Sequence, residues 1–131
     1  TYENYKINTT VRECVFELID RIGLFTQEDY QDYRAYCVFL VWNQLKKICS
    51  LETAWQNKRN LVREYRETKF YQKYLKGKKY TVSKVKFSHK IIYSIFEKKM
   101  DDLLVTVLSA RKQLSKIRIN LKCSLGGAKN V

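Results

Sequence analysis

The absence of proline is the feature that most restricts the fold of this 131-residue chain, which also contains only four glycines. Folds rich in loops or strands normally rely on both residues for their turns, whereas helix interiors exclude proline. Apolar residues make up 45% of the chain and charged residues 30%, a balance typical of globular domains. We therefore predict an all-α bundle of four to five helices with no substantial sheet.

The first helix is indicated by apolar residues that recur every three or four positions. Thr9 or Thr10 suits its N-cap, and Gly23 suits a left-handed residue just past its end. The apolar positions with this spacing are Val11, Cys14, Val15, Leu18, Ile19 and Ile22.

Two further helices follow in the sequence. Thr26 suits an N-cap because acidic residues follow it, and the second helix runs to about Ile48. Its middle is apolar around almost the whole circumference, which predicts a position at the centre of the bundle. Ser50 suits the N-cap of a third helix that continues to Leu75, with one apolar face and one face rich in Lys, Arg and Gln.

The last third of the chain begins with an alternating segment, residues 80–87. A lone strand there has nothing to pair with, so we expect an extended connector. The apolar stripe that follows predicts one long helix, or two helices in line with Asp101 or Asp102 at a break. Its members are Ile92, Phe96, Met100, Leu103, Val107, Ala110, Leu114 and Ile117.

The length of the chain predicts one domain spanning residues 1–131. We expect its two ends, residues 1–9 and 122–131, to be frayed, because the first is polar and the second contains a glycine pair. The sequence opens with Thr1 and not with methionine, which leads us to expect a fragment of a longer chain.

Charge is distributed unevenly along the chain, whose net formal charge is +13. Residues 1–50 hold six basic and seven acidic groups, whereas residues 58–90 hold twelve basic groups against Glu64 and Glu67. A field of one sign in one third of a domain favours an anionic partner, such as nucleic acid or anionic lipid. The alternative is a lysine-rich surface that only promotes solubility.

The twelve basic residues are the candidate anion-facing site, because helical spacings of three, four and seven place several of them on a common face. Nearby aromatic residues would stack on bases or lie at a lipid headgroup boundary. For Tyr65 and Tyr71 a position in the core is the preferred interpretation. For Tyr80 a core position and a ligand-contacting position both remain open. The candidates are Lys58, Arg59, Arg63, Arg66, Lys69, Lys73, Lys76, Lys78, Lys79, Lys84, Lys86 and Lys90.

Catalytic motifs are not recognisable in this segment, so we predict neither a catalytic residue nor a metal site nor a cofactor. The single histidine, His89, leaves few nucleophilic triads or histidine-based metal sites. The four cysteines are widely spaced and favour a reduced chain. The apolar runs are far shorter than the ~20 residues that span a bilayer. We therefore expect a cytoplasmic chain that lies, at most, at the inner face of a membrane.

The order of these features resembles the C-terminal helical region of bacterial family-two glycosyltransferases. The resemblance begins with residues 11–22, the Gly-Leu-Phe at 23–25 and the Tyr-Gln-Asp-Tyr-Arg at 30–34 that leads into an apolar helix. The Tyr-Gln-Lys-Tyr-Leu at 71–75, the lysine-rich joint and residues 91–108 continue it, so it covers about residues 8–118. The paired-aspartate metal motif and the nucleotide-binding strands of the catalytic domain are absent, so no catalytic residue is carried over.

The resemblance implies a non-catalytic domain of an enzyme that uses a nucleotide sugar to build cell-surface polysaccharide. Its basic helical face would then serve in membrane docking or in assembly, with an anionic membrane surface or the catalytic domain of the same chain as its partner. A homo-oligomer is also compatible with the sequence. The alternatives are a small basic nucleic-acid-binding protein and, third, a helical adaptor or immunity protein that binds another protein.

Overall fold

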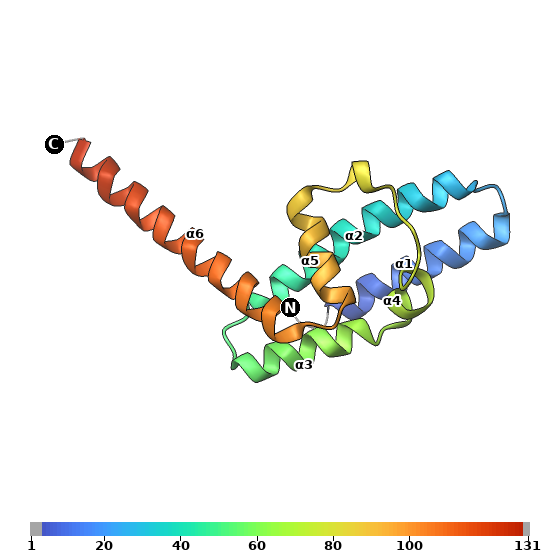
Figure 1. Ribbon diagram of the computed structural model, residues 1–131, viewed down its shortest axis with the longest axis horizontal. Helices are drawn as coiled ribbons and strands as arrows, with labels where there is room; N and C mark the ends of the chain where they lie inside the picture. Colours follow the sequence, from blue (N-terminus) through green and yellow to red (C-terminus); the bar gives the residue numbers. More distant parts are fainter. Residues whose placement is uncertain (1–3, 130–131) are drawn as a thin grey trace.

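The computed structural model describes the backbone of residues 4–129 and the side chains of residues 8–114 and 116–123. These residues form six α-helices and one 3-10 turn, and no strand is found among them, which confirms the all-α prediction. The elements are α1 (Asn4–Ile22), α2 (Gln27–Cys49), α3 (Trp55–Arg66), α4 (Lys69–Tyr74), η1 (Val82–Lys84), α5 (Phe87–Glu97) and α6 (Asp101–Lys129) (Figure 1).

The turn between α1 and α2 follows the predicted capping chemistry. Gly23 has a positive φ of 71°, and its N–H donates to the Ile19 carbonyl at 3.0 Å. Thr26 and Asp29 form a reciprocal capping box, in which each side chain accepts from the other residue's backbone N–H. These bonds satisfy backbone donors that the first turn of α2 would otherwise expose.

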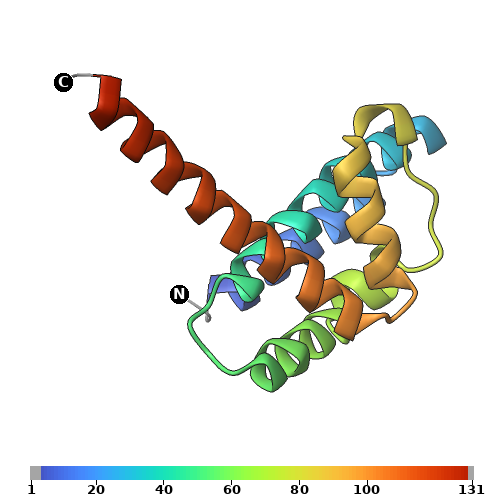
Figure 2. The same ribbon diagram turned by 60° about the vertical axis from the view of Figure 1, so that its left-hand side comes forward.

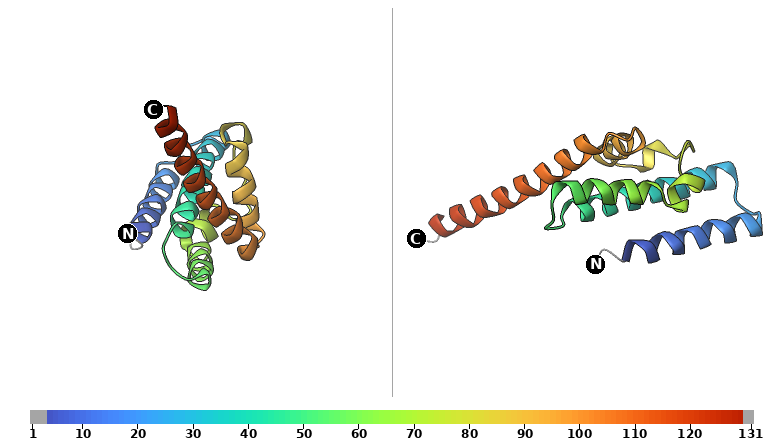
Figure 3. Two further views of the ribbon diagram at one scale, coloured as in Figure 1. Left: turned by 90° about the vertical axis from the view of Figure 1, so that its left-hand side faces the viewer. Right: turned by 90° about the horizontal axis from the view of Figure 1, so that it is seen from below.

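Helix α2 lies at the centre of the bundle, as predicted, and contacts α3, α5 and α6. Eight of its residues are buried, because apolar side chains occupy nearly its whole circumference. Helix α1 forms an outer layer that packs mainly on α4 (Figure 3). The ring of Phe16, which is 2% exposed, stacks on the ring of Tyr74 at 4.6 Å and fixes this layer.

The apolar positions of α1 are only partly covered by the bundle. Val15 and Ile19 are half-buried, whereas Val11, Cys14, Leu18 and Ile22 are exposed. The side of α1 that packs on the bundle is the one that carries the buried Phe16, because its ring stacks on Tyr74.

The predicted third helix is two helices, since α3 ends at Arg66 and α4 begins at Lys69. Thr68 makes the break: its hydroxyl donates to the Tyr65 carbonyl at 2.7 Å and caps the first turn of α4. Ser50 is the C-cap of α2 and not the N-cap of α3. Thr9 and Thr10 lie inside α1 and do not cap it. The extra break explains why six helices form where four to five were expected.

A second break separates α5 from α6 at Lys99, which has a positive φ of 59°. The two helices are therefore separate and cross at an angle instead of lying in line (Figure 2). Residues 80–87 form the expected extended connector, apart from the short η1 turn. Its Thr81 hydroxyl donates to Asp32 of α2 at 2.6 Å and holds the connector against the bundle.

The ends of the chain, which we expect to be frayed, are helical as far as the structure describes them. Residues 4–9 belong to α1 and residues 122–129 to α6, while residues 1–3 and 130–131 lie outside the described residues. The C-terminal part of α6 extends away from the bundle as a single helix (Figures 1 and 3). We call residues 113–129 the projecting segment, which is ~25 Å long at the usual helical rise.

Candidate functional site

Three of the predicted anion-facing residues, all in α3, bind the first turn of α6. Arg66 donates two hydrogen bonds to the Asp101 carboxylate, with Nη1 at 3.1 Å from Oδ2 and Nη2 bonded to Oδ1. Arg63 Nε lies 3.5 Å from the same carboxylate, and Arg59 Nε lies 3.2 Å from Asp102. Arg66 is only 3% exposed, so its predicted role in facing an external anion is wrong.

Three further candidates are also engaged within the chain. Lys58 Nζ donates to the Cys49 carbonyl at 2.8 Å, where a cation complements the C-terminal end of α2. Lys69 pairs with Glu17 of α1 at 2.8 Å, and Lys84 pairs with Asp32 of α2 at 2.9 Å.

The lysines in these two exposed pairs lower the pKa of the partner carboxyl groups, since they favour the charged form. For Glu17 the hydrogen bond from Lys69 is the main cause. For Asp32 the bond from Thr81 comes first, and Lys84 adds to it. Both lysines therefore tie helices together and present less charge to an outside ligand.

The six remaining candidates are spread over α4, the connector and α5. Lys73 lies over the Tyr74 ring at 5.3 Å, and Lys76 is 3.5 Å from Gln72. Because the candidates span three segments with breaks between them, they do not form the single-helix stripe that their spacing predicts. Those that are exposed are Lys73, Lys76, Lys78, Lys79 and Lys86, and Lys90 is half-buried.

A second basic surface lies on α6, where the sequence analysis identified only an apolar helical stripe and an end that we expect to be frayed. From residue 103 to the end the chain holds six basic residues and no acidic one. Arg111 lies over the Trp42 ring at 5.5 Å, and Lys112 donates to the Ser50 carbonyl at 2.5 Å. Beyond them the projecting segment carries Lys116, Arg118 and Lys122, all exposed.

The projecting segment also carries exposed apolar side chains, three of which share one face, whereas Ile119 lies on the other side of the helix. Leu114, Ile117 and Leu121 are 66%, 53% and 57% exposed, and their spacing of three and four residues places them on one face. Arg118 and Lys122 fall along one edge of that face at 100° per residue. Helical apolar side chains with an adjacent row of cations suit an anionic surface with an apolar interior. The absence of acidic residues after Asp102 is the signal that sequence reasoning could have used.

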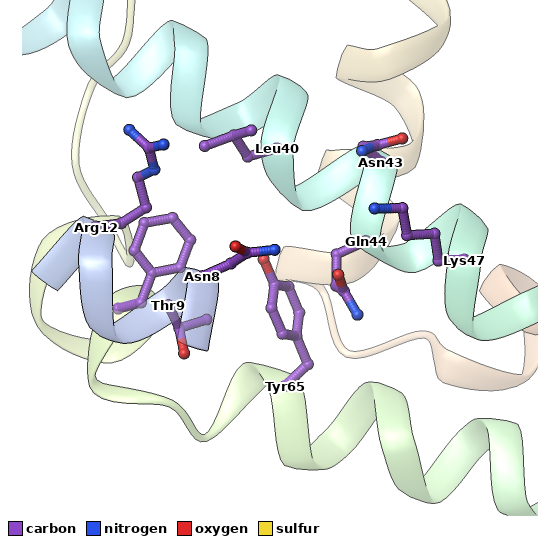
Figure 4. Close-up of a pocket in the computed structure, with 9 residues that line it drawn as sticks. Asn8, Thr9, Arg12, Leu40, Asn43, Gln44, Lys47 and Tyr65 are labelled. Atoms are coloured by element: carbon purple, nitrogen blue, oxygen red, sulfur yellow. The ribbon is translucent and has the colours of Figure 1, made fainter. Parts of the chain in front are cut away.

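A small polar cavity of about 140 Å³ lies between α1, α2 and α3 (Figure 4). The Tyr65 side chain of α3 extends toward Asn8 of α1, and the Lys47 side chain of α2 points into the same cavity (Figure 4). Amide groups of Asn43 and Gln44 complete its polar lining. A cavity of this size and polarity accommodates a few ordered waters.

The histidine and the cysteines are the titratable side chains with catalytic potential, and Tyr65, Tyr71 and Tyr80 are the tyrosines with predicted core or ligand-contacting positions. His89 is buried against Trp42, with ring centroids 4.0 Å apart, and its pKa is lowered chiefly by burial. The cysteines are free thiols, and burial raises the pKa of Cys49 to about 11. Tyr65 and Tyr71 are core residues, as preferred, and Tyr80 is half-buried. Among the side chains that the structure describes, residues 8–114 and 116–123, no group of three or more potential ligands could hold a metal ion.

Comparison with family models, curated proteins and solved structures found no match to this chain. In the part of the chain that the structure describes, none of the helices combines the length and apolar character needed to cross a membrane.

Proposed function

We propose that this chain is a non-catalytic helical module that docks on an anionic membrane surface through the projecting segment of α6. The observation that carries the proposal is the combination of an exposed apolar face, Leu114, Ile117 and Leu121, with cations and no acidic residue on the same helix. Its role as the C-terminal domain of a polysaccharide-building glycosyltransferase rests on the sequence resemblance described above.

The physical case begins with the instability of a solitary helix in water. A helix of this length gains little from propensity alone and normally depends on packing of its apolar face. Burying one leucine or isoleucine side chain contributes about 1.5–3 kcal/mol, and each basic residue near an anionic surface contributes ~1 kcal/mol. Three apolar side chains, with Arg118 and Lys122 along the edge of their face, are enough for reversible docking with the helix axis in the plane of the surface.

The combination of an apolar face and cations distinguishes a membrane surface from the alternative partners. A nucleic-acid partner needs cations but gives the apolar face of the projecting segment nothing to bury. A protein partner would bury that face but would also need acidic groups opposite Arg118 and Lys122. An anionic lipid surface would bury the apolar face and pair with the cations together. The test below therefore includes nucleic acid and protein as alternative partners.

The test compares vesicle binding of two variants with the same net charge at ~150 mM salt, where weak attraction is largely screened. The first reverses Lys116, Arg118 and Lys122 to Glu, and the matched control reverses the exposed Lys73, Lys78 and Lys79. Each lowers the net charge from +13 to +7. We expect the first to lose binding to phosphatidylserine-containing vesicles and the control to keep most of it.

Three outcomes would contradict the proposal. Equal loss in both variants would mean that net charge, and not the projecting segment, controls binding. Binding of single- or double-stranded nucleic acid that the unmodified chain shows at the same salt and the Lys116, Arg118 and Lys122 variant loses would favour the nucleic-acid alternative. Binding to neither would leave a protein partner as the explanation of the exposed face.

A further inference from the structure

A row of aromatic rings runs along α2 and includes no residue of the projecting segment. Tyr33, Tyr36, Phe39 and Trp42 follow each other every three residues, with ring centroids 6.3, 6.5 and 6.0 Å apart. His89 of α5 closes the row by stacking on Trp42. The end of the row at Trp42 is buried, whereas Tyr36 and Phe39 are 46% and 41% exposed, so two neighbouring rings are accessible from solvent.

The exposed rings line an open groove of about 370 Å³ between α2 and the segment that contains η1 and the start of α5. Lys84, Lys86 and Asp32 stand in the same groove. The Asp32 carboxylate is satisfied by Thr81 and Lys84, at 2.6 and 2.9 Å. Lys86 has no ion-pair partner among the described residues, and its exposed ammonium remains available to a ligand.

The charge around the row is positive. Arg12 lies 5.6 Å from the centre of the Tyr36 ring, and Lys46 lies 4.5 Å from the centre of the Trp42 ring. A ligand that fits this groove therefore combines a planar ring with negative charge, since the rings offer faces for stacking and the cations attract an anion. A lipid acyl chain fits poorly, because it would remove Asp32 and Lys84 from water without replacing their hydration.

We propose that this groove binds a nucleotide unit, with the base stacked on Phe39 or Tyr36 and the phosphate held by Lys86. Two adjacent rings suit two successive bases of a single strand, and stacking of this kind tolerates any base because every base has a flat face. A duplex hides those faces, so it would bind through its phosphates alone. This binding site is independent of membrane docking, because it uses α2, η1 and α5 and none of the projecting segment.

The experiment measures binding of a fluorescein-labelled oligothymidylate of about eight nucleotides to the full chain at ~150 mM salt. Unlabelled thymidine monophosphate serves as a competitor that distinguishes a site for a free nucleotide from a site for a strand. A duplex of the same length serves as a second competitor that distinguishes double-stranded from single-stranded binding. Phe39→Ala is the test variant. Trp55→Ala is its matched control, because Trp55 is 42% exposed and also has a cation, Arg59, over its ring.

We expect Phe39→Ala to weaken oligonucleotide binding about 5- to 150-fold, the range that loss of one stacked base implies, and Trp55→Ala to leave it unchanged. Lys86→Gln should reduce the slope of log affinity against log salt by about 0.7, the value for one phosphate contact on a single strand. Tyr36→Ala should repeat the effect of Phe39→Ala, with circular dichroism confirming that each variant is folded.

Several results would overturn the nucleotide site. They are the absence of oligonucleotide binding at this salt, equal affinity for the duplex and the single strand, and equal effects of Phe39→Ala and Trp55→Ala. Binding of an anionic polysaccharide but not of the oligonucleotide would also overturn it. So would a Phe39→Ala variant that loses vesicle binding and keeps oligonucleotide binding. The α6 charge-reversal variant provides the separation from the proposed function, since it should keep the Phe39-dependent binding.

Discussion

The Arg66 guanidinium and the Asp101 carboxylate form a two-point ion pair in the interior, between the end of α3 and the first residue of α6. The pair is also anchored to α5, because Arg66 Nε donates to the Phe96 carbonyl at 3.0 Å. Its planar geometry fixes the relative position of three helices. It therefore also sets the direction in which α6 leaves the bundle.

Replacing Asp101 by Asn should strongly destabilise the fold, because it leaves the Arg66 charge buried without its partner. We expect the free energy of unfolding to fall by about 3–5 kcal/mol, as measured by urea denaturation. Asp102→Asn is the control: its carboxylate pairs with Arg59 at the surface, and its loss should cost no more than about 1 kcal/mol. Equal effects of the two substitutions would contradict a special role for the buried pair.

The stability of the chain should decrease as the pH falls below about 6.5. Burial lowers the pKa of His89, and the positive charges of Lys86, Arg111 and Lys46 lower it further. In the window between this lowered value and the ordinary 6.5, the unfolded chain binds a proton that the folded chain does not. The free energy of unfolding therefore increases with pH across that window. Acidification through the same window lowers it again.

Urea midpoints at about pH 7.5 and 5.5 check this dependence. His89→Phe retains a ring against Trp42 but cannot be protonated, so its midpoint should change less between the two conditions than that of the unmodified chain. An identical shift in both proteins would assign the pH dependence to other groups.

Loss of the Thr26 side chain should weaken the start of α2. Thr26→Ala removes the hydroxyl that accepts from the Asp29 backbone N–H at 3.1 Å, and we expect a loss of about 1 kcal/mol in thermal or urea unfolding. Thr26→Ser preserves the acceptor and should remain close to the unmodified chain. If Ser were as damaging as Ala, the methyl group and not the hydrogen bond would be responsible.

Local sequence signals predicted the parts of the fold that depend on neighbours in the chain. The left-handed Gly23 and the Thr26 cap are short-range features, and both are found as predicted. The orientation of α1 was missed, because periodicity identifies an apolar face without saying which tertiary neighbour will occupy the core. The ring of Phe16 packs on Tyr74, a residue far along the chain, and no local pattern encodes that contact.

The candidate site was predicted only in part, for the same reason. Arg66 looks like its exposed neighbours in the sequence, and its burial depends on Asp101, which lies 35 positions away. Leu114 and Ile117 continue a regular apolar stripe that predicts a helix, yet the bundle ends before it reaches them. Periodicity reports the amphipathic character of a helix, whereas the extent of the neighbouring helices decides whether its face is covered.

Hydrogen–deuterium exchange of the full chain, with and without phosphatidylserine-containing vesicles, tests membrane docking most directly, because it locates the contact along the chain. In solution the projecting segment should exchange rapidly, since beyond its first turn it extends away from the bundle. With vesicles, we predict protection concentrated in residues 113–123 and little change in α3 and α4. Protection confined to residues 58–79, or unchanged exchange of the projecting segment in vesicle-bound protein, would contradict the account.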